Sequence, residues 1–332
     1  MCPNIYPLHF TSRSSIKFPK CKKQELSMKK ILSLLLACMA AATIAVSEEC
    51  DYSQPYGTYF CLDADCFIDI GAGYRNDNFK WTTLSHLPFP EETRTLHEKW
   101  KNIGMGIIEV NAQMLAREHW LFKFDFDYGW FDQIKQQTVY GFNFNRRAPF
   151  RVTSKTSGAV YDVSGAFGYE FDLSYFCLSF APLIGWSYDY QFFKNHHYCE
   201  RKREFRTNNQ HRFTWNGPWI GFAATYWVCP VWQFYLDYAF HFAQFKAHFH
   251  DIFLEAHSGH STGNQAYGNQ ATVATSYQFC EDWFLGFKFD YKDFWCDKAT
   301  TSIRGIGEGA RTHQKQIRWT SYYATVELGY MF

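Results

Sequence analysis

Polar and apolar residues alternate one by one along most of this chain. In 120–130 every second residue is aromatic, and polar residues such as Lys123 and Asp125 lie between the aromatic ones. The same period of two recurs in 232–242 and 283–292. In an extended strand, a period of two places alternate side chains on opposite faces. The pattern therefore predicts strands with one aromatic face and one charged or small face.

Ten such strands are predicted, with boundaries good to a few residues. They cover roughly 66–80, 99–115, 120–134, 158–171, 175–192, 212–228, 231–249, 266–279, 283–297 and 315–332. Short turns at 116–119, 172–174, 229–230 and 280–282 alternate with long loops at about 81–98, 135–157, 193–211, 250–265 and 298–314. This arrangement is typical of an all-β fold, the transmembrane antiparallel β-barrel, with long extracellular loops and short periplasmic turns.

Tryptophans follow the same alternation of turns and loops. Three of them open a strand directly after a short turn, namely Trp120, Trp232 and Trp283. Five others lie near the long loops, namely Trp100, Trp130, Trp219, Trp295 and Trp319. Two belts of aromatic side chains at the two membrane interfaces would explain both groups. A soluble β-sandwich also alternates, but it would impose no such rule on tryptophan positions.

Composition agrees with a barrel and excludes other classes. Aromatic residues make up 20% of the chain, yet the mean hydropathy is only −0.35. Beyond residue 47 no apolar run approaches the roughly 18 residues of a membrane-spanning helix. Of 33 basic and 32 acidic residues, seven and one lie in 1–47, so the remainder carries a net charge of −5. That balance provides no basic surface for nucleic acid.

The N-terminal region predicts export. Residues 28–47 combine Met28-Lys29-Lys30, an apolar stretch and a small-residue cleavage site, which is the order found in a secretory signal peptide. Residues 1–27 would then be a mis-annotated upstream extension, 48–65 a periplasmic segment and 66–332 the barrel. A lipoprotein anchored through Cys38 is the alternative, but the residues after Cys38 stay apolar.

Eight of the eleven cysteines lie beyond the predicted signal peptide. An even number of cysteines in an exported chain permits disulfides. The sequence does not define how they would pair.

The C-terminal strand ends on a regular apolar series. Val326, Leu328, Tyr330 and Phe332 alternate with polar or small residues and share one face. A terminal Phe that closes such a series resembles the signal read by the outer-membrane assembly machinery. We therefore expect this machinery and outer-membrane lipids among the partners, and the outer membrane of a Gram-negative-type bacterium as the location.

Two family resemblances follow from these features. Ten strands with five long loops resemble the omptins, and residues Trp100-Lys101-Asn102-Ile103, 161–168 and 217–221 are similar to omptin strands in the same order. The aromatic composition, the many cysteines and the general layout also resemble outer-membrane proteins of Protochlamydia and other chlamydia-like bacteria. That second resemblance implies porin function.

The omptin resemblance would imply a protease, which needs an Asp pair on the second loop and an Asp-x-His on the fourth. Here the second loop has Asp132 and then no acid as far as Asn145. On the fourth loop Asp251 matches the motif, but Phe253 takes the place of the His. Because both halves of the site are incomplete, the chain is expected not to be an enzyme.

The inward face is expected to be charged and wet. Its predicted lining residues are Asp69, Arg75, Glu109, Lys123, Asp125, Asp127, Asp162, Glu170, Asp189, Asp237, His241, Lys288, Asp290, Lys292 and Glu327. Unpaired charges do not stay in a dry interior. A ten-stranded barrel leaves at most a narrow passage, and the excess of acids would favour cations. The sequence thus predicts a porin-like protein for small ions or solutes; the alternative is a surface structural or adhesion protein.

Two further candidates are weaker. Arg201, Lys202, Arg203 and Arg206 form a basic group on the third loop that could bind lipopolysaccharide phosphates. His248 and His250 would share a strand face and could hold a transition metal, but histidines on a surface explain this spacing equally. No metal site and no cofactor is predicted.

Overall fold

The computed structural model describes residues 64–87, 92–116, 119–140, 150–173, 176–200, 203–229, 231–251, 257–280, 282–303 and 311–332, with side chains omitted near several strand ends. The chain divides into residues 1–61 and 62–332, and the described residues belong to the second unit. Its strands are β1 Ala64–Leu87, β2 Glu92–Ala116, β3 Trp120–Tyr140, β4 Phe150–Tyr169, β5 Phe171–Leu173, β6 Leu178–Glu200, β7 Arg203–Cys229, β8 Trp232–Asp251, β9 His257–Gln278, β10 Trp283–Ile303 and β11 Arg311–Met331.

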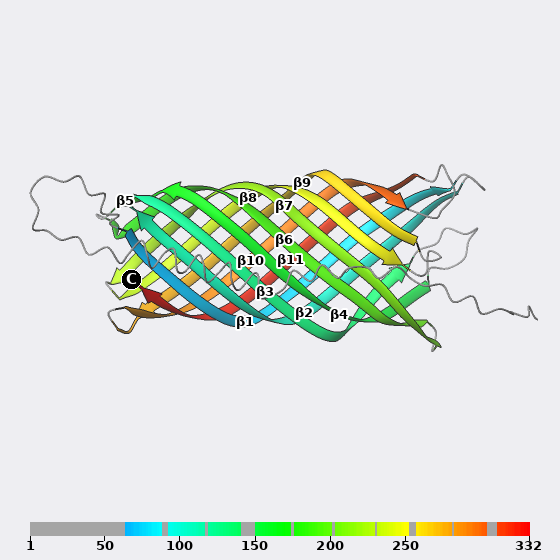
Figure 1. Ribbon diagram of the computed structural model, residues 1–332, viewed down its shortest axis with the longest axis horizontal. Helices are drawn as coiled ribbons and strands as arrows, with labels where there is room; N and C mark the ends of the chain where they lie inside the picture. Colours follow the sequence, from blue (N-terminus) through cyan, green and yellow to red (C-terminus); the bar gives the residue numbers. More distant parts are fainter. Residues whose placement is uncertain are drawn as a thin grey trace, which may run out of the picture. The chain divides into compact units, whose positions relative to one another are not determined.

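These strands form one closed antiparallel barrel (Figure 1). Consecutive strands pair from β1 to β4 and from β5 to β11, β1 pairs with β11, and β4 pairs with β6 to close the cylinder. The short strand β5 continues β4 after Glu170 and also pairs with β6. Because β4 and β5 together occupy one position in the wall, the barrel has ten strands. The predicted fold class is confirmed. The prediction of a turn at 172–174 was wrong at its first two residues, which belong to β5.

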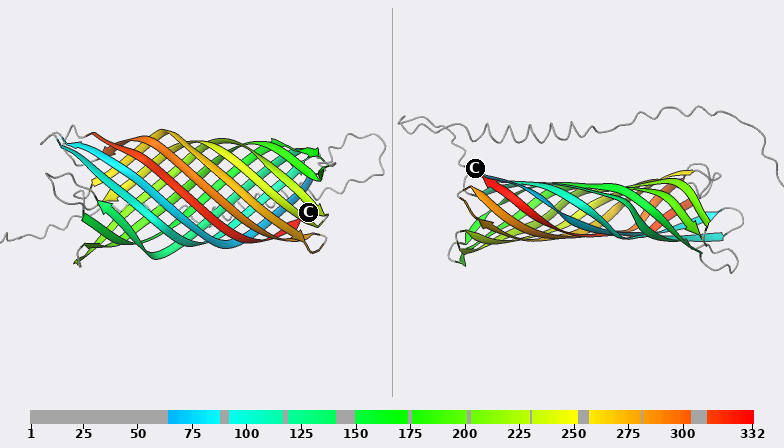
Figure 2. Two further views of the ribbon diagram at one scale, coloured as in Figure 1. Left: turned by 180° about the vertical axis from the view of Figure 1, so that it is seen from behind. Right: turned by 90° about the horizontal axis from the view of Figure 1, so that it is seen from below.

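The two ends of the barrel differ. We call the end that holds the short connections and the C-terminal Phe332 the turn end, and the opposite end the loop end. The strands run obliquely between these ends, as both views in Figure 2 show. Among the described residues no helix has the length and apolar character needed to cross a membrane.

Strands reach much further toward the loop end than predicted. Residues 81–87 and 92–98, expected to form a loop, are paired strand residues of β1 and β2. The pairing of β6 with β7 likewise continues to Glu200 and Arg203. Backbone pairing needs no apolar side chains, so it persists where the aromatic alternation that guided the prediction has ended. The parts of the predicted loops at 88–91, 141–149, 201–202, 252–256 and 304–310 lie outside the described residues.

A band of apolar side chains surrounds the outside of the barrel near the turn end. On β8 the side chains of Trp232, Phe234, Leu236, Tyr238 and Phe242 are 37–45% exposed. The tryptophans that follow short turns all point outward, with Trp120 41%, Trp232 42% and Trp283 42% exposed. Exposed apolar area on this scale is typical of a lipid-facing surface.

The second predicted belt, near the long connections, is correct only in part. Trp130 is 48% exposed and points outward. Trp100, Trp219 and Trp319 are at most 5% exposed and point into the barrel, so their assignment to a lipid-facing belt was wrong.

A bulge reverses the faces of β2 near its loop end. Asn102 adopts a positive φ of 55°, and its backbone N–H donates to Asn78 Oδ1 at 3.0 Å. The β1–β2 register shifts at this point, between Asp77 and Phe79. An extra residue in one strand exchanges inward and outward positions beyond it. Trp100 consequently turns inward.

The described cysteines form no disulfide, namely Cys66, Cys177, Cys229, Cys280 and Cys296. Cys50, Cys61 and Cys199 lie outside the described side chains. The expected disulfides are therefore not seen.

Candidate functional site

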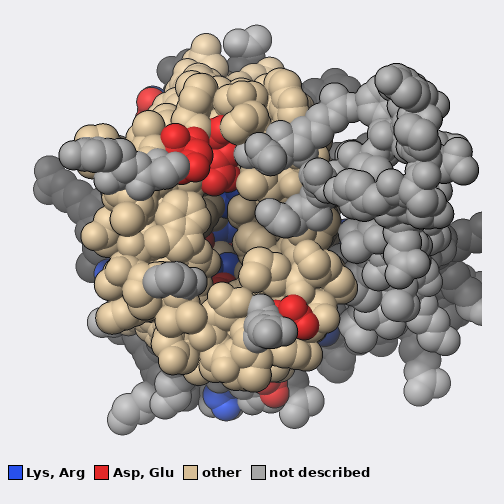
Figure 3. Space-filling view, turned by 90° about the vertical axis from the view of Figure 1, so that its left-hand side faces the viewer, with Lys and Arg blue, Asp and Glu red and all other residues tan. Residues whose placement is uncertain are grey.

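The barrel holds a cavity of about 420 Å³ that opens at the turn end (Figure 3). Turn-end residues such as Trp227, Asp282 and Met331 line its mouth, and Asp189 and Lys292 line its floor. Figure 3 shows basic and acidic side chains inside the hollow. The cavity is thus a water-accessible pocket that occupies only part of the lumen.

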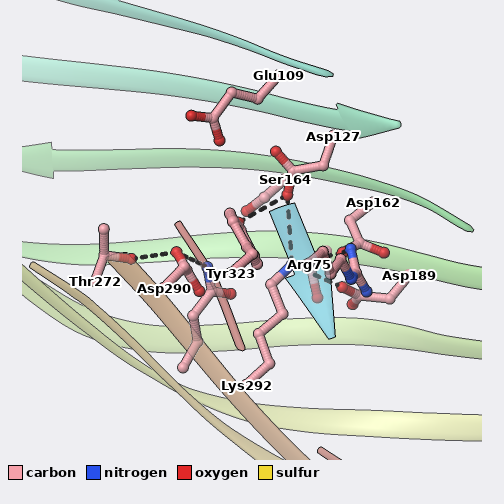
Figure 4. Close-up of polar contacts among 12 residues, drawn as sticks. Arg75, Glu109, Asp127, Asp162, Ser164, Asp189, Thr272, Asp290, Lys292 and Tyr323 are labelled. Carbon is pink, nitrogen blue, oxygen red and sulfur yellow. Dashed lines mark hydrogen bonds and ion pairs between the residues drawn. The ribbon is translucent and has the colours of Figure 1, made fainter. Parts of the chain in front are cut away.

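The floor of the cavity is a layer of buried ion pairs. Arg75, on β1, is fully buried and lies between two carboxylates (Figure 4). Its Nε donates to Asp77 Oδ1 at 2.9 Å, and its Nη1 donates to Asp162 Oδ2 at 2.7 Å. A buried guanidinium with paired hydrogen bonds is held in one geometry. Arg75 therefore joins β1 to β4 across the lumen.

Lys292, on β10, contacts a row of three acids. Asp127 pairs in register with Asp162 on β4, and Asp162 with Asp189 on β6, so the three carboxylates lie side by side. Lys292 Nζ lies 2.9 Å from Asp162, 3.3 Å from Asp189 and 3.8 Å from Asp127. The Tyr323 hydroxyl donates to Asp127 at 2.9 Å. Like charges on neighbouring strands repel, so this row depends on the lysine.

Lys288 forms a second centre nearer the turn end. Its Nζ lies 2.7 Å from Glu109 and 3.3 Å from Glu327. Asn111 donates to Asp69 at 2.6 Å and accepts from Lys288 at 3.3 Å. These contacts link β1, β2, β10 and β11 inside the lumen.

The other charged groups are less completely paired. Lys123 bridges to Asp237 and to the Tyr235 hydroxyl. Asp290 accepts a hydrogen bond from Thr272 at 2.6 Å but forms no ion pair within the described residues. Asp125 has neither an ion pair nor a hydrogen bond there.

Most of the residues predicted from the sequence lie on this cavity. They are Asp69, Lys123, Asp125, Asp127, Asp162, Glu170, Asp189, Asp237, Lys288, Asp290, Lys292 and Glu327. Glu109 contacts Lys288 from just outside the lining. The prediction missed Asp77, Asn111 and Tyr323, whose contacts depend on strand register. For Tyr323 the available signal in the sequence is alternation, which puts it on the same face as Thr325 and Glu327.

The loop-end half of the lumen is packed with aromatic rings. We call this the aromatic layer; its members are Phe79, Trp81, Trp100, Phe193, Phe213, Trp215, Phe245, Phe294 and Trp319, each at most 3% exposed. Phe79 stacks on Phe213 with ring centroids 4.1 Å apart, and Phe294 stacks on Trp319 at 5.2 Å. The wet interior predicted from the sequence is therefore wrong for this half.

A glycine makes room for one of these rings. A Cβ at Gly268 would lie 2.5 Å from the Phe294 ring, closer than van der Waals contact allows. The absence of a side chain on β9 thus lets Phe294 lie flat against the wall and stack on Trp319.

His211 is buried in the aromatic layer, on the loop-end side of the apolar band. Its ring lies 5.1 Å from Trp100 and its Nδ1 has no hydrogen-bond partner within the described residues. Burial lowers the pKa of His211 to about 3, because a charged imidazolium would be surrounded by rings without solvent. His211 is therefore neutral at physiological pH.

This histidine predicts a pH-dependent loss of stability. Between about pH 6.5 and 3 the unfolded chain binds a proton at His211 and the folded barrel does not, so stability falls as the pH falls, by at most about 1.4 kcal/mol per pH unit. His211→Phe should remove this part of the slope in urea unfolding followed at pH 7, 5 and 4. His250→Phe, at an exposed position, is the control. Parallel curves for the parent and His211→Phe would contradict the assignment.

Histidines elsewhere do not gather at the cavity floor. His241 is buried and shares a 3.0 Å hydrogen bond with Ser187. On the outer surface His248 pairs across strands with His260, their Nδ1 atoms 3.2 Å apart, and not with His250. Within the described residues no group of three metal-ligating side chains is found.

The remaining predicted site residues lie on the outer surface of the barrel or outside the described side chains. Val326, Leu328 and Phe332 are 46–55% exposed, and the Phe332 N–H donates to the Cys66 carbonyl at 2.8 Å. Tyr330 lies on the same outward face, half-buried. The candidate lipopolysaccharide-binding residues Arg201, Lys202, Arg203 and Arg206 lie outside the described side chains. Of the omptin-like positions, Asp132 is exposed on the outside of β3, and the side chains of Asp251 and Phe253 are not described.

Solved structures with this architecture are outer-membrane barrels. The outer membrane protease OmpT from Escherichia coli superposes with a TM-score of 0.63 at 10% identity, covering 83% of this chain and 99% of that one. A major outer membrane protein from Thermus thermophilus gives a TM-score of 0.35 at 12% identity, covering 81% and 99%. The similarity to OmpT shows the fold alone, and the similarity to the Thermus thermophilus protein is too low to support a conclusion.

The sequence itself matches a protein family. No curated protein matches the chain. The family described as Protochlamydia outer membrane protein (Pom) matches residues 69–332, which is the barrel from β1 to its last residue. With the outward apolar band and the likeness to an outer-membrane barrel, this match places the chain in the outer membrane. The chain belongs to the Protochlamydia outer membrane protein family.

Proposed function

We propose that this protein is a porin-like envelope protein with a narrow, cation-preferring passage that is shut at rest. The observation that carries the proposal is the turn-end cavity, which is lined by ten carboxylates but only three lysines. Walls with an excess of one charge raise the local concentration of the opposite ion. Cations should therefore be enriched in the cavity.

The aromatic layer explains why the passage would open rarely. A buried aromatic side chain removes about 150–250 Å² from water, and each Å² contributes about 25 cal/mol. Turning one ring into water thus costs about 4–6 kcal/mol, which corresponds to a population below about one in a thousand. Conduction would require a neighbouring apolar surface to receive the displaced rings.

The same layer favours a second candidate, a non-conducting structural or adhesion protein. Such a protein would present its loop end to the exterior and use the closed lumen only for rigidity. Strands that continue past the apolar band agree with this role.

Planar-bilayer recording of the refolded barrel separates the two candidates. The proposal predicts brief openings with a cation-selective reversal potential under a salt gradient. Asp125→Asn/Asp127→Asn keeps shape and hydrogen bonding but removes two carboxylates from the lining, so selectivity should fall most at about 0.1 M salt, where the Debye length is about 10 Å, and little at 1 M.

Asp132→Asn, on the outer surface of β3, is the matched control and should leave selectivity unchanged. A parent barrel that never opens at any voltage or salt concentration would favour the structural role. Openings that prefer anions would contradict the charge argument.

We also propose that the protein is not a protease. An omptin-like site would need acids gathered over the lumen, and Asp132 points away from it. Incubation of the folded barrel with peptides cleaved by omptins should give no product.

A further inference from the structure

The lysines of the lumen are fully engaged, whereas several carboxylates are not. Lys292 and Lys288 each contact two or more acids, and Lys123 contacts Asp237. Asp125 and Asp290 face the same cavity without an ion pair within the described residues. The cavity thus retains uncompensated negative charge in a partly closed space, a situation that favours a bound cation.

Individual oxygen atoms point to the same conclusion. Asp290 and Asp189 are each 2% exposed, and Asp290 Oδ1 and Asp189 Oδ2 have no hydrogen-bond partner within the described residues. Asp127 Oδ1, on a side chain that is 4% exposed, is equally unpaired. All three residues line the cavity. Buried acceptors without donors are costly, so a ligand that brings N–H donors would stabilise the site.

The barrel itself shows which cation these acids accommodate. Lys292 Nζ lies within 4 Å of three carboxylates, and Lys288 Nζ contacts two. A primary ammonium has three donors and can satisfy two or three acceptors at once. No group of three metal ligands is found among the described residues.

The walls nearer the mouth are largely apolar. Phe67, Leu115, Trp227 and Phe284 line the cavity there together with Tyr235, and Lys123 Nζ lies 5.0 Å from the centre of the Tyr235 ring. Aromatic and aliphatic walls suit methylene groups, and the Tyr235 ring face also attracts cations. At about 30 Å³ per water the cavity holds about 14 waters, enough space for an extended chain of amines.

We propose that the turn-end cavity binds linear aliphatic diamines and polyamines. One ammonium lies at the unpaired oxygen of Asp290, the methylene chain follows the apolar wall, and a second ammonium lies near Asp125. This proposal names a ligand class for the lumen whose cation preference was proposed above, but binding does not require that the lumen conducts.

Isothermal titration of the refolded full chain in detergent tests the proposal. The probes are 1,5-diaminopentane and spermidine at low salt, and both should give saturable binding that weakens as salt rises. Asp290→Asn and Asp125→Asn should each weaken binding about tenfold or more, because each removes a charged acceptor. Asp132→Asn should bind like the parent.

Two other probes define the class of ligand. 1-Aminopentane has the same chain with one ammonium and should bind more weakly, and the dianion glutarate should not bind. Absence of saturable binding by both amines, or equal affinity in the parent, Asp125→Asn and Asp290→Asn, would overturn the proposal. If Asp290→Asn does not fold, Asp125→Asn decides alone, since Asp125 has no ion pair or hydrogen bond to lose among the described residues. A barrel that binds but never conducts would sink only the porin proposal.

Discussion

Replacing Trp319 by alanine is expected to convert a barrel that opens rarely into one that conducts steadily. Trp319 is fully buried between Phe294, at 5.2 Å, and Trp215, at 6.5 Å, in the aromatic layer. Below it lies Arg75, whose guanidinium is 5.5 Å from the Trp319 ring. Removing this ring would leave a gap in the aromatic layer directly next to the ion-pair floor of the cavity. Single-channel recording would show long openings, with a preference for cations.

The control must lose a ring without opening the lumen. Phe289→Ala serves, because Phe289 is 44% exposed on the lipid-facing side of the same strand as Phe294. It should behave like the parent. Phe294→Ala tests the layer at a second position and should also conduct. Trp319→Ala and Phe294→Ala barrels that fold but stay silent would mean that the ion-pair floor, and not the aromatic layer, is the barrier.

Replacing Arg75 by methionine should destabilise the barrel by about 3–5 kcal/mol, the range found when one partner of a buried ion pair is removed. Arg75 is fully buried, and Asp77, which receives two of its hydrogen bonds, is buried to the same degree. Without the guanidinium, Asp77 has no other cation partner within the described residues. Urea unfolding at pH 8, followed by tryptophan fluorescence, measures the loss.

A second substitution identifies the cause of this loss. Arg75→Met/Asp77→Asn also removes the uncompensated negative charge of Asp77 and should recover part of the stability. Arg318→Met breaks the Arg318–Asp293 pair, in which Arg318 is 48% exposed, and should cost less than about 1 kcal/mol. Equal losses in Arg75→Met and Arg318→Met would show that burial does not set the strength of these pairs.

The fold could be predicted because alternation is a local property. Each strand shows its two faces in its own ten or so residues, as in 120–130, and turns such as 229–230 separate one strand from the next. The acids on the inward face followed from the same rule. Strand ends were poorly predicted because pairing beyond the membrane needs no aromatic face.

Contacts across the lumen could not be predicted, since they depend on how far each strand is shifted against the next. Arg75 and Asp162 are 87 residues apart, and Lys292 and Asp162 are 130 apart. The aromatic layer was missed for a related reason. In this chain the inward and outward faces both carry aromatic residues toward the loop end, and the bulge at Asn102 reverses the faces of β2. Near the loop end, an aromatic residue in the sequence therefore does not indicate whether its side chain points into the lumen or outward.

The strands that continue beyond the apolar band also set the height of the loop end above that band. From Trp130, at the edge of the apolar band, β3 continues to Tyr140 as paired strand. Ten residues at about 3.3 Å, inclined by about 40°, raise the end of the strand by about 25 Å. The paired strands therefore form a collar that extends beyond the apolar band. A molecule that approaches the barrel from its loop end would meet that collar before it meets the membrane.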